Sequence, residues 1–224
     1  MLFSKEAAQA NVRNRDGKRV FYLAKGDQLT SEAKEFLLRE RIEILPAEKA
    51  KPERYRLLSG GFLEEKPEHM THLYGDVLVE KTHPRIAFRG MVDTLEAEIL
   101  LCQAQFPQLR EPLEEILTLA RKMIRCDVLN EALPPAPLGG LDEKALRAHS
   151  HRPQEFYGQP HFMPSASDGQ VVLQLNRLRT LVRQTERSAA AALPERADIL
   201  QALNRMSSFV YILMIREKGN KSAF

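Results

Sequence analysis

The chain has 224 residues, a length that suits one domain, or one domain with a small appendage. It carries 33 Lys and Arg against 30 Asp and Glu, which gives a formal charge of +3 and excludes the strongly basic surface of a nucleic-acid-binding protein. The hydrophobic content of 43% argues against extensive disorder, and two cysteines exclude a disulfide scaffold or a zinc site with several thiolates.

The N-terminal segment lacks the apolar core of a signal peptide and is charged from Lys5 onward. The apolar runs elsewhere are shorter than the ~20 residues that span a bilayer. We therefore expect a soluble, cytoplasmic protein whose thiols stay reduced, with neither a membrane nor a nucleic acid as partner.

Residues 1–60 mix short β-like and α-like segments. Thr30 is a suitable helix cap, with acidic residues in the turn that follows it. The expected elements are a strand at 19–23, a helix at 31–41, a strand at 42–46 and a linker at 47–56. This region is predicted to form a small α/β appendage, and it shows no chemical motif.

From residue 90 the apolar residues recur at helical spacing. The first two stripes are Val92, Leu95, Ile99, Cys102 and Phe106, and then Leu113, Ile116, Leu117, Ala120, Met123, Ile124 and Val128. Pro107 closes the first helix, and the Pro- and Gly-rich segment 132–140 is a connection.

Three more helices are expected after this connection. The first is short, at 142–149, and two long ones follow, with Pro194 at the start of the last. Helices with one apolar face each must pack together. The predicted fold class is therefore mainly α, a five-helix bundle with a small N-terminal α/β appendage.

A charged row stands out in the fourth helix. Arg179, Arg183 and Glu186 follow one another at i, i+4 and i+7, beside the apolar stripe. Such a row either forms salt bridges on a solvated face or meets an anion in a groove. Arginine suits polyphosphate, and a nearby carboxylate can hold Mg²⁺. Spacing alone favours the salt-bridge network.

The segment 71–85 is polar and turn-prone, with Gly75 at its centre. Its Thr, Gly and Lys residues could cradle phosphates, but an ordinary exposed loop before a helix is the simpler interpretation. The histidines fit no standard zinc spacing, which favours surface imidazoles and core-packed thiols over a metal site. No P-loop, dinucleotide-binding or nucleophile-elbow motif is present.

Residues 72–98, 178–187 and 198–208 resemble the ethanolamine-utilisation cobalamin adenosyltransferases, and the likeness spans about residues 20–215. The resemblance implies a homotrimer of helix bundles with active sites between subunits. It also implies transfer of the 5′-deoxyadenosyl group of ATP to the cobalt of reduced cobalamin, with release of triphosphate. Domain boundaries follow from it: an ATP-loop segment at 61–90 and the bundle at 91–218.

The resemblance assigns ATP contacts to residues from two parts of the chain. Lys81 and Arg85 match a K-x-x-x-R motif, and Thr71 and Gly75 echo a glycine-rich ATP loop with altered spacing. In the helices, Arg183 would bind triphosphate, Glu186 would help to hold Mg²⁺, and Asn204 would hydrogen-bond the adenosine. Arg183 and Glu186 are thus expected to be catalytic.

Two more roles follow from the resemblance. Residues 90–95 match G-x-x-D-E-L, which makes Asp93 the expected partner of Arg179 in an ion pair across the subunit interface. In the propanediol-utilisation type, a Phe three residues before a motif Pro forms an apolar wall against the corrinoid. Here that position holds His161, so Phe162 and Met163 are expected to line the cobalamin site beside it, with Phe162 taking the catalytic role.

Some ethanolamine-type relatives carry a cysteine-rich metal motif before the bundle, but the first cysteine here is Cys102. Mg²⁺ with ATP is therefore the expected metal. A non-catalytic module that carries cobalamin or docks to a microcompartment remains the alternative function. The resemblance also implies handover of the product to ethanolamine ammonia-lyase and a location at a bacterial microcompartment.

Overall fold

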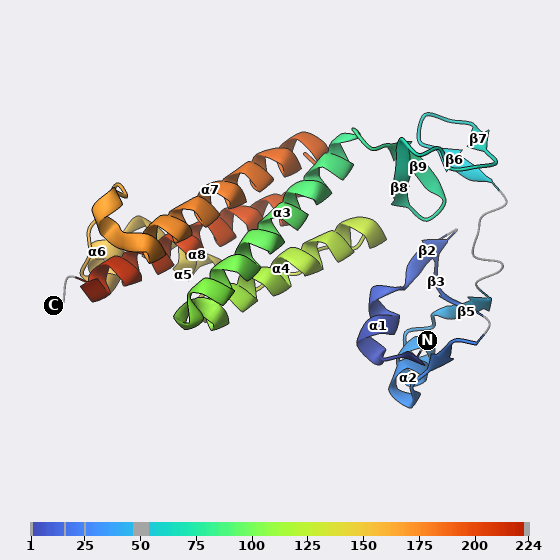
Figure 1. The fold of residues 1–224 in the computed structure, drawn as a ribbon, viewed down its shortest axis with the longest axis horizontal. Helices are drawn as coiled ribbons and strands as arrows, with labels where there is room; N and C mark the ends of the chain where they lie inside the picture. Colours follow the sequence, from blue (N-terminus) through green and yellow to red (C-terminus); the bar gives the residue numbers. More distant parts are fainter. Residues whose placement is uncertain (1, 16, 25, 47–53, 222–224) are drawn as a thin grey trace. The chain divides into compact units, whose positions relative to one another are not determined.

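The computed structural model describes residues 2–15, 17–24, 26–46 and 54–221. The chain divides into two compact units, Met1–His83 and Pro84–Phe224, which are described separately (Figure 1). The long helix α3 begins at Pro84, inside the segment expected at 61–90, and the bounds of that segment stay a prediction.

Small sheets and two helices make up the beginning of the first unit. Its elements are β1 (Leu2–Phe3), α1 (Lys5–Ala10), β2 (Arg13–Arg15), β3 (Lys18–Leu23), β4 (Gln28–Leu29), α2 (Ser31–Arg39) and β5 (Glu43–Pro46). Strand β3 lies between β2, which is antiparallel to it, and β5, which is parallel. Its Phe21 is fully buried in a small core with Phe36 and Leu37 of α2.

The predicted strand–helix–strand order is confirmed here. Thr30 caps α2, since its hydroxyl accepts a hydrogen bond from the Ala33 backbone N–H at 3.2 Å. The helix ends at Arg39, earlier than predicted, because Arg41 adopts a left-handed conformation with φ of 52°. The predicted linker is partly wrong: residues 47–53 lie outside the described residues, but Tyr55 and Arg56 belong to a strand.

A third sheet, of four strands, ends the first unit. Its strands are β6 (Tyr55–Leu57), β7 (Phe62–Leu63), β8 (Met70–Tyr74) and β9 (Val77–Glu80), in the order β7-β6-β9-β8. The prediction of an exposed loop at 71–85 is therefore wrong over residues 71–80, where β8 and β9 form an antiparallel hairpin. Residues 77–79 of β9 are all buried, which explains the pairing of this segment.

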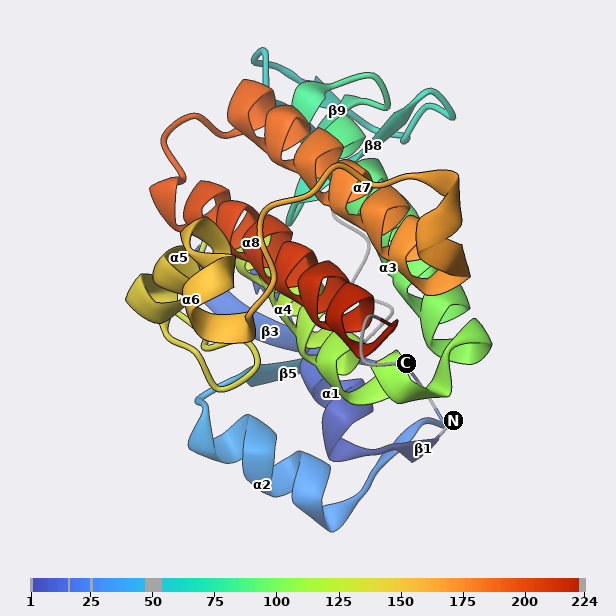
Figure 2. The same ribbon diagram turned by 90° about the vertical axis from the view of Figure 1, so that its left-hand side faces the viewer.

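The second unit is helical. Its α-helices are α3 (Pro84–Gln105), α4 (Arg110–Leu129), α5 (Glu143–His151), α6 (Pro153–Tyr157), α7 (Gly169–Ala192) and α8 (Ala197–Lys221). Helix α7 packs on α8 and on α3, and α3 also packs on α4 (Figures 1 and 2). The shorter α5 and α6 both contact α8. A mainly α fold with short N-terminal strands is thus confirmed, whereas α6 was not predicted.

The predicted apolar stripes form the core of the helical unit. Val92, Leu95 and Ile99 of α3 are fully buried, as are Leu175 and Val182 of α7. Both cysteines are buried, and burial raises the pKa of the Cys102 thiol to about 11. Their expected role in core packing is confirmed.

Helix starts in this unit are partly as expected. The Asp142 carboxylate accepts a hydrogen bond from the Ala145 backbone N–H at 2.8 Å and begins α5 as predicted. The placement of Pro194 in the first turn of the last helix is wrong, because α8 begins at Ala197 and Pro194 lies in the preceding turn. Among the described helices, none combines the length and hydrophobicity of a bilayer span.

Candidate active site

A cleft of about 820 Å³ lies in the helical unit, between α7, α8 and the connection before α7. Seven residues that the sequence singled out line it together: His161, Phe162, Met163, Arg179, Arg183, Glu186 and Asn204. They come from three separate segments of the chain. The cleft has a charged part on α7 and an apolar part at Phe162 and Met163.

Helix α7 positions the charged part. Its core residues Leu175, Leu178 and Val182 are fully buried, so Arg179 and Arg183, which directly follow Leu178 and Val182, are turned to the edge of the packed face. Glu186 is linked to α8 through Asn204, whose Nδ2 donates to Glu186 Oε1 at 3.2 Å. Glu186 of α7 and Asn204 of α8 therefore face each other across the contact between the two helices.

Among the residues that the structure describes, the two arginines of the row have no carboxylate partner. Within the described part of the chain, neither Arg179 nor Arg183 forms an ion pair, and the alternative of a salt-bridge network along α7 is therefore not found there. Burial, followed by the charge of Arg183, lowers the pKa of the Arg179 guanidinium. Two cations that destabilise each other in a cleft form a suitable anion site.

Tyr211 of α8 lies between the two parts of the cleft, and the sequence analysis missed it. The Arg179 guanidinium carbon lies 5.2 Å from the centroid of the Tyr211 ring, a cation–π contact. The Phe162 ring is stacked against the same Tyr211 ring, with 6.3 Å between the two ring centroids. The sequence does carry a signal for Tyr211: it lies seven residues after Asn204 on the same helix, and residues at i and i+7 share a helix face.

The predicted cobalamin residues have different surroundings. Phe162 packs against the core of the helical unit, and the Lys218 Nζ lies 4.5 Å from its ring centroid. Met163 is 88% exposed, whereas His161 is hydrogen-bonded at both ring nitrogens. An exposed thioether beside a packed ring provides apolar surface for a large flat ligand.

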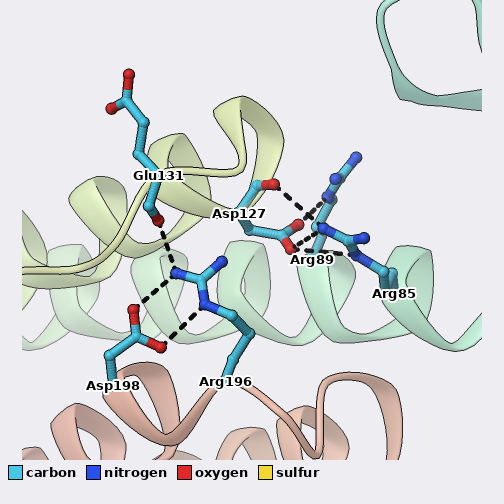
Figure 3. Close-up of polar contacts among 6 residues, drawn as sticks. All are labelled: Arg85, Arg89, Asp127, Glu131, Arg196 and Asp198. Atoms are coloured by element: carbon cyan, nitrogen blue, oxygen red, sulfur yellow. Dashed lines mark hydrogen bonds and ion pairs between the residues drawn. The ribbon is translucent and has the colours of Figure 1, made fainter.

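Arg85 is held in a buried cluster at the start of α3 (Figure 3). Its Nη2 lies 2.6 Å from Oδ1 of Asp127, a carboxylate with no exposed surface at the end of α4. Arg89 Nε donates to Oδ2 of the same carboxylate at 2.8 Å. Nearby, Arg196 Nη2 donates at 2.8 Å both to Asp198 and to the Glu131 carbonyl oxygen. Arg85 thus has a structural partner that the sequence did not indicate.

The remaining predicted ATP residues belong to the first unit. Thr71 lies in β8, and Gly75 is in the turn of the hairpin with a φ of 51°. Lys81 follows β9, and its Nζ lies 3.1 Å from Oε1 of Glu68. Asp93 is exposed on α3, and within the described residues it forms no ion pair, so its pairing with Arg179 stays a prediction.

Glu186 is the only carboxylate among the described residues that line the cleft. Mg²⁺ usually takes one or two carboxylates together with substrate phosphates, so a single Glu beside two arginines fits Mg²⁺ that arrives with a nucleotide. Among the described residues there is no group of three or more His, Cys, Asp or Glu that could hold a metal by itself.

Two corrinoid adenosyltransferases are similar to this chain in sequence. Corrinoid adenosyltransferase EutT of Salmonella typhimurium is 38% identical over 158 residues, which cover 67% of this chain and 59% of that protein. EutT of Escherichia coli is 37% identical over the same length. The chain therefore spans about three fifths of the length of these relatives.

Solved structures show the fold. A variant of the PduO-type ATP:corrinoid adenosyltransferase from Lactobacillus reuteri, in complex with cobalamin and ATP, superposes with a TM-score of 0.56 at 19% identity, covering 69% of this chain and 91% of that one. A second variant, in complex with ATP, gives a TM-score of 0.55. The family model described as cobalamin adenosyltransferase matches residues 62–217. By this match, the chain belongs to the cobalamin adenosyltransferase family.

Proposed function

We propose that the protein is an ATP:corrinoid adenosyltransferase, which moves the 5′-deoxyadenosyl group of ATP to Co(I) of cobalamin and releases triphosphate. One observation carries the proposal: in a chain of this family, one cleft joins an apolar surface to two arginines that have no carboxylate partner within the described ranges. An anionic and an apolar substrate are what such a cleft can hold side by side.

The charged part of the cleft would bind ATP. Arg183 presents a planar fork of donors that suits phosphate oxygens, and Asn204 offers an amide to the nucleoside. Glu186 would hold Mg²⁺ through its carboxylate oxygen that does not accept from Asn204. The metal supplies positive charge that neutralises the triphosphate. Lys81, Arg85, Thr71 and Gly75 are further expected ATP contacts, and Lys81 and Arg85 would reach phosphate only by exchanging their present carboxylate partners.

The reaction is a displacement at carbon. The electron pair of Co(I) attacks C5′ of ATP and forms the Co–C bond, while the C5′–O bond breaks and its electron pair leaves with triphosphate. Negative charge therefore grows on the leaving oxygen, beside which Arg183 would lie. Phe162 and Met163 would exclude water from the corrinoid face, as an apolar wall does.

The finer features remain proposals as well. They include the five-helix bundle, the ATP-loop segment at 61–90, the homotrimer, and the Asp93–Arg179 ion pair between its subunits. The half-buried, unpaired state of Arg179 supports the last of these, because a carboxylate from a second copy would stabilise it. A cytoplasmic location, association with a microcompartment and handover to ethanolamine ammonia-lyase follow from the resemblance alone.

The test is direct assay of the purified protein. ATP, cob(II)alamin and a strong reductant are mixed with it, the light-sensitive spectrum of adenosylcobalamin is followed, and triphosphate is quantified. Formation of both products in equal amounts supports the transferase. If neither forms while adenosylcobalamin binds tightly, the chain is the carrier module instead, and the proposal is wrong. Arg179 and Arg183, which form no ion pair with any described residue, argue against a carrier, because a carrier has no need of a triphosphate site.

A further inference from the structure

Tyr211 occupies the middle of the cleft and touches both of its parts. Its ring lies under the Arg179 guanidinium and also stacks on Phe162, with 23° between the two ring planes. Since the ring contacts the proposed ATP side and the proposed corrinoid side, any rotation of Tyr211 would disturb both. What fixes this ring therefore matters for the site.

His161 holds the Tyr211 hydroxyl. Its Nδ1 lies 2.9 Å from the Tyr211 Oη, and its Nε2 lies 3.1 Å from the backbone carbonyl oxygen of His151. A carbonyl oxygen only accepts, so in the neutral imidazole Nε2 carries the hydrogen and Nδ1 accepts from the tyrosine hydroxyl. The two rings are also nearly parallel, with 10° between their planes.

This arrangement uses the only lone pair of the neutral imidazole. Coordination of a metal by His161 would require an imidazole nitrogen without hydrogen, and Nδ1 is the one such atom. That atom is occupied by the Tyr211 hydroxyl as long as the pair is intact. A histidine beside a corrinoid site would otherwise be a natural axial ligand of cobalt.

We propose that His161 and Tyr211 form a positioning pair, in which His161 fixes the Tyr211 ring between Arg179 and Phe162 and does not bind cobalt. The proposal rests on the proposed function, because it concerns how the same cleft holds its corrinoid. Neither residue is assigned a chemical step. The pair sets the shape of the boundary between the two substrates.

A double-mutant cycle tests the pair through steady-state kinetics. His161→Ala and Tyr211→Phe should each lower kcat/KM for the corrinoid about fivefold, the effect of one lost hydrogen bond, and should raise KM for ATP by a similar factor, because the freed Tyr211 ring also contacts Arg179 on the ATP side. The double variant should lose no more than either single one, because both remove the same interaction. His161→Asn, whose side-chain oxygen can still accept from Tyr211, should lose less activity than His161→Ala, which separates the hydrogen bond from the mere presence of a ring.

Independent losses that multiply to about 25-fold in the double variant would overturn the pair. Far-ultraviolet circular dichroism and thermal unfolding of each variant separate lost positioning from lost folding. His161 is exposed and Tyr211→Phe keeps the ring, so the fold is expected to persist.

Spectroscopy tests the statement about cobalt. Cob(II)inamide lacks the nucleotide base, so axial nitrogen splitting in its electron paramagnetic resonance spectrum can come only from the protein. With wild-type protein and ATP we expect no such splitting. Nitrogen splitting that disappears in His161→Ala would show that His161 binds cobalt and would overturn the proposal.

The two proposals fail in different ways. A wild-type protein that forms no adenosylcobalamin defeats the proposed function and the role of the pair with it. An active wild type with multiplicative losses or a His161–cobalt bond defeats the pair alone. ¹⁵N resonances of the His161 ring in the substrate-free protein give a third readout: hydrogen on Nε2 supports the pair, and hydrogen on Nδ1 alone contradicts it.

Discussion

The helical unit contains two groups of arginines that differ in their partners: one group is paired with carboxylates, and the other lines the cleft. At the ends of α3 and α4, Arg85 and Arg89 share the buried carboxylate of Asp127, and Arg196 nearby is paired with Asp198. On α7, Arg179 and Arg183 form no ion pair within the described residues and lie beside a cleft. Residue type is the same in both groups, and only the partners differ.

This difference distinguishes arginines that stabilise the fold through ion pairs from arginines that are placed to bind a ligand. A carboxylate with no exposed surface is tolerated only when it is paired, and breaking such a pair is far more costly than never having had it. Arg179 is half-buried and has no carboxylate partner among the described residues, which reduces stability, and an anion bound in the cleft would compensate its charge. Four predictions test this contrast, from the largest expected effect to the smallest.

Asp127→Ala should lower the free energy of unfolding by about 3–5 kcal/mol, because two guanidiniums that are less than 20% exposed would lose their counter-charge. Denaturant titration of the purified variant measures this. Asn at the same position keeps the volume and should recover only a part of the loss. A change below about 1 kcal/mol would mean that water replaces the carboxylate without cost.

Arg183→Ala should reduce kcat/KM for ATP about 100-fold, as expected for loss of a charged contact to the leaving group. Its melting temperature should stay equal or rise, because Arg183 disfavours the charged form of its neighbour Arg179. The exposed Arg187 of the same helix provides the matched control, and Arg187→Ala should be close to wild type. Equal losses in both variants would exclude a specific role for Arg183.

Asp198→Asn should change how the free energy of unfolding depends on pH. Hydrogen bonds from Arg196 hold the pKa of the Asp198 carboxyl well below its usual range, so the carboxylate stabilises the fold above the unfolded pKa of about 4. This contribution is lost as the pH falls through the lower folded pKa. The variant should be less stable near pH 7 by about 2 kcal/mol, and this deficit should shrink below about pH 4. Urea unfolding at a series of pH values checks this; a constant deficit would contradict it.

Arg121→Ala should have the smallest effect. Arg121 Nε donates to Glu96 at 2.9 Å, but the arginine side chain is 54% exposed. Exposed ion pairs contribute about 0.5 kcal/mol or less, and salt screens them. Thermal unfolding at low and high salt is the measurement. A loss comparable to that of Asp127→Ala would remove the distinction between buried and exposed pairs.

The helical periodicity of the sequence predicted most of the helical unit. Once the apolar stripe of α7 was known, the face of Arg179, Arg183 and Glu186 followed, since helix geometry fixes the angle between neighbouring positions. The cleft could be anticipated only through the resemblance, because periodicity does not say which faces meet. The confirmed parts are thus those that local spacing determines.

The missed residues depend on contacts between distant segments. Asp127 is a polar residue beside an apolar stripe, and nothing local shows that two arginines some forty positions earlier reach it. In the β8–β9 hairpin, the polar residues at 71 and 72 favour a loop in the sequence, although the apolar run at 77–79 forms a buried strand. Tyr211 acquires its importance from Arg179 and His161, which belong to other elements.

Pro84, the first residue of α3, has a consequence for how the protein unfolds. A proline ring disfavours the helical conformation in the residue before it, and proline has no N–H for a helical bond, so α3 cannot extend backward through His83. Cooperative helix growth therefore stops at the boundary between the two units. Each unit can melt as a foldon of its own, and calorimetry should resolve two transitions in place of one.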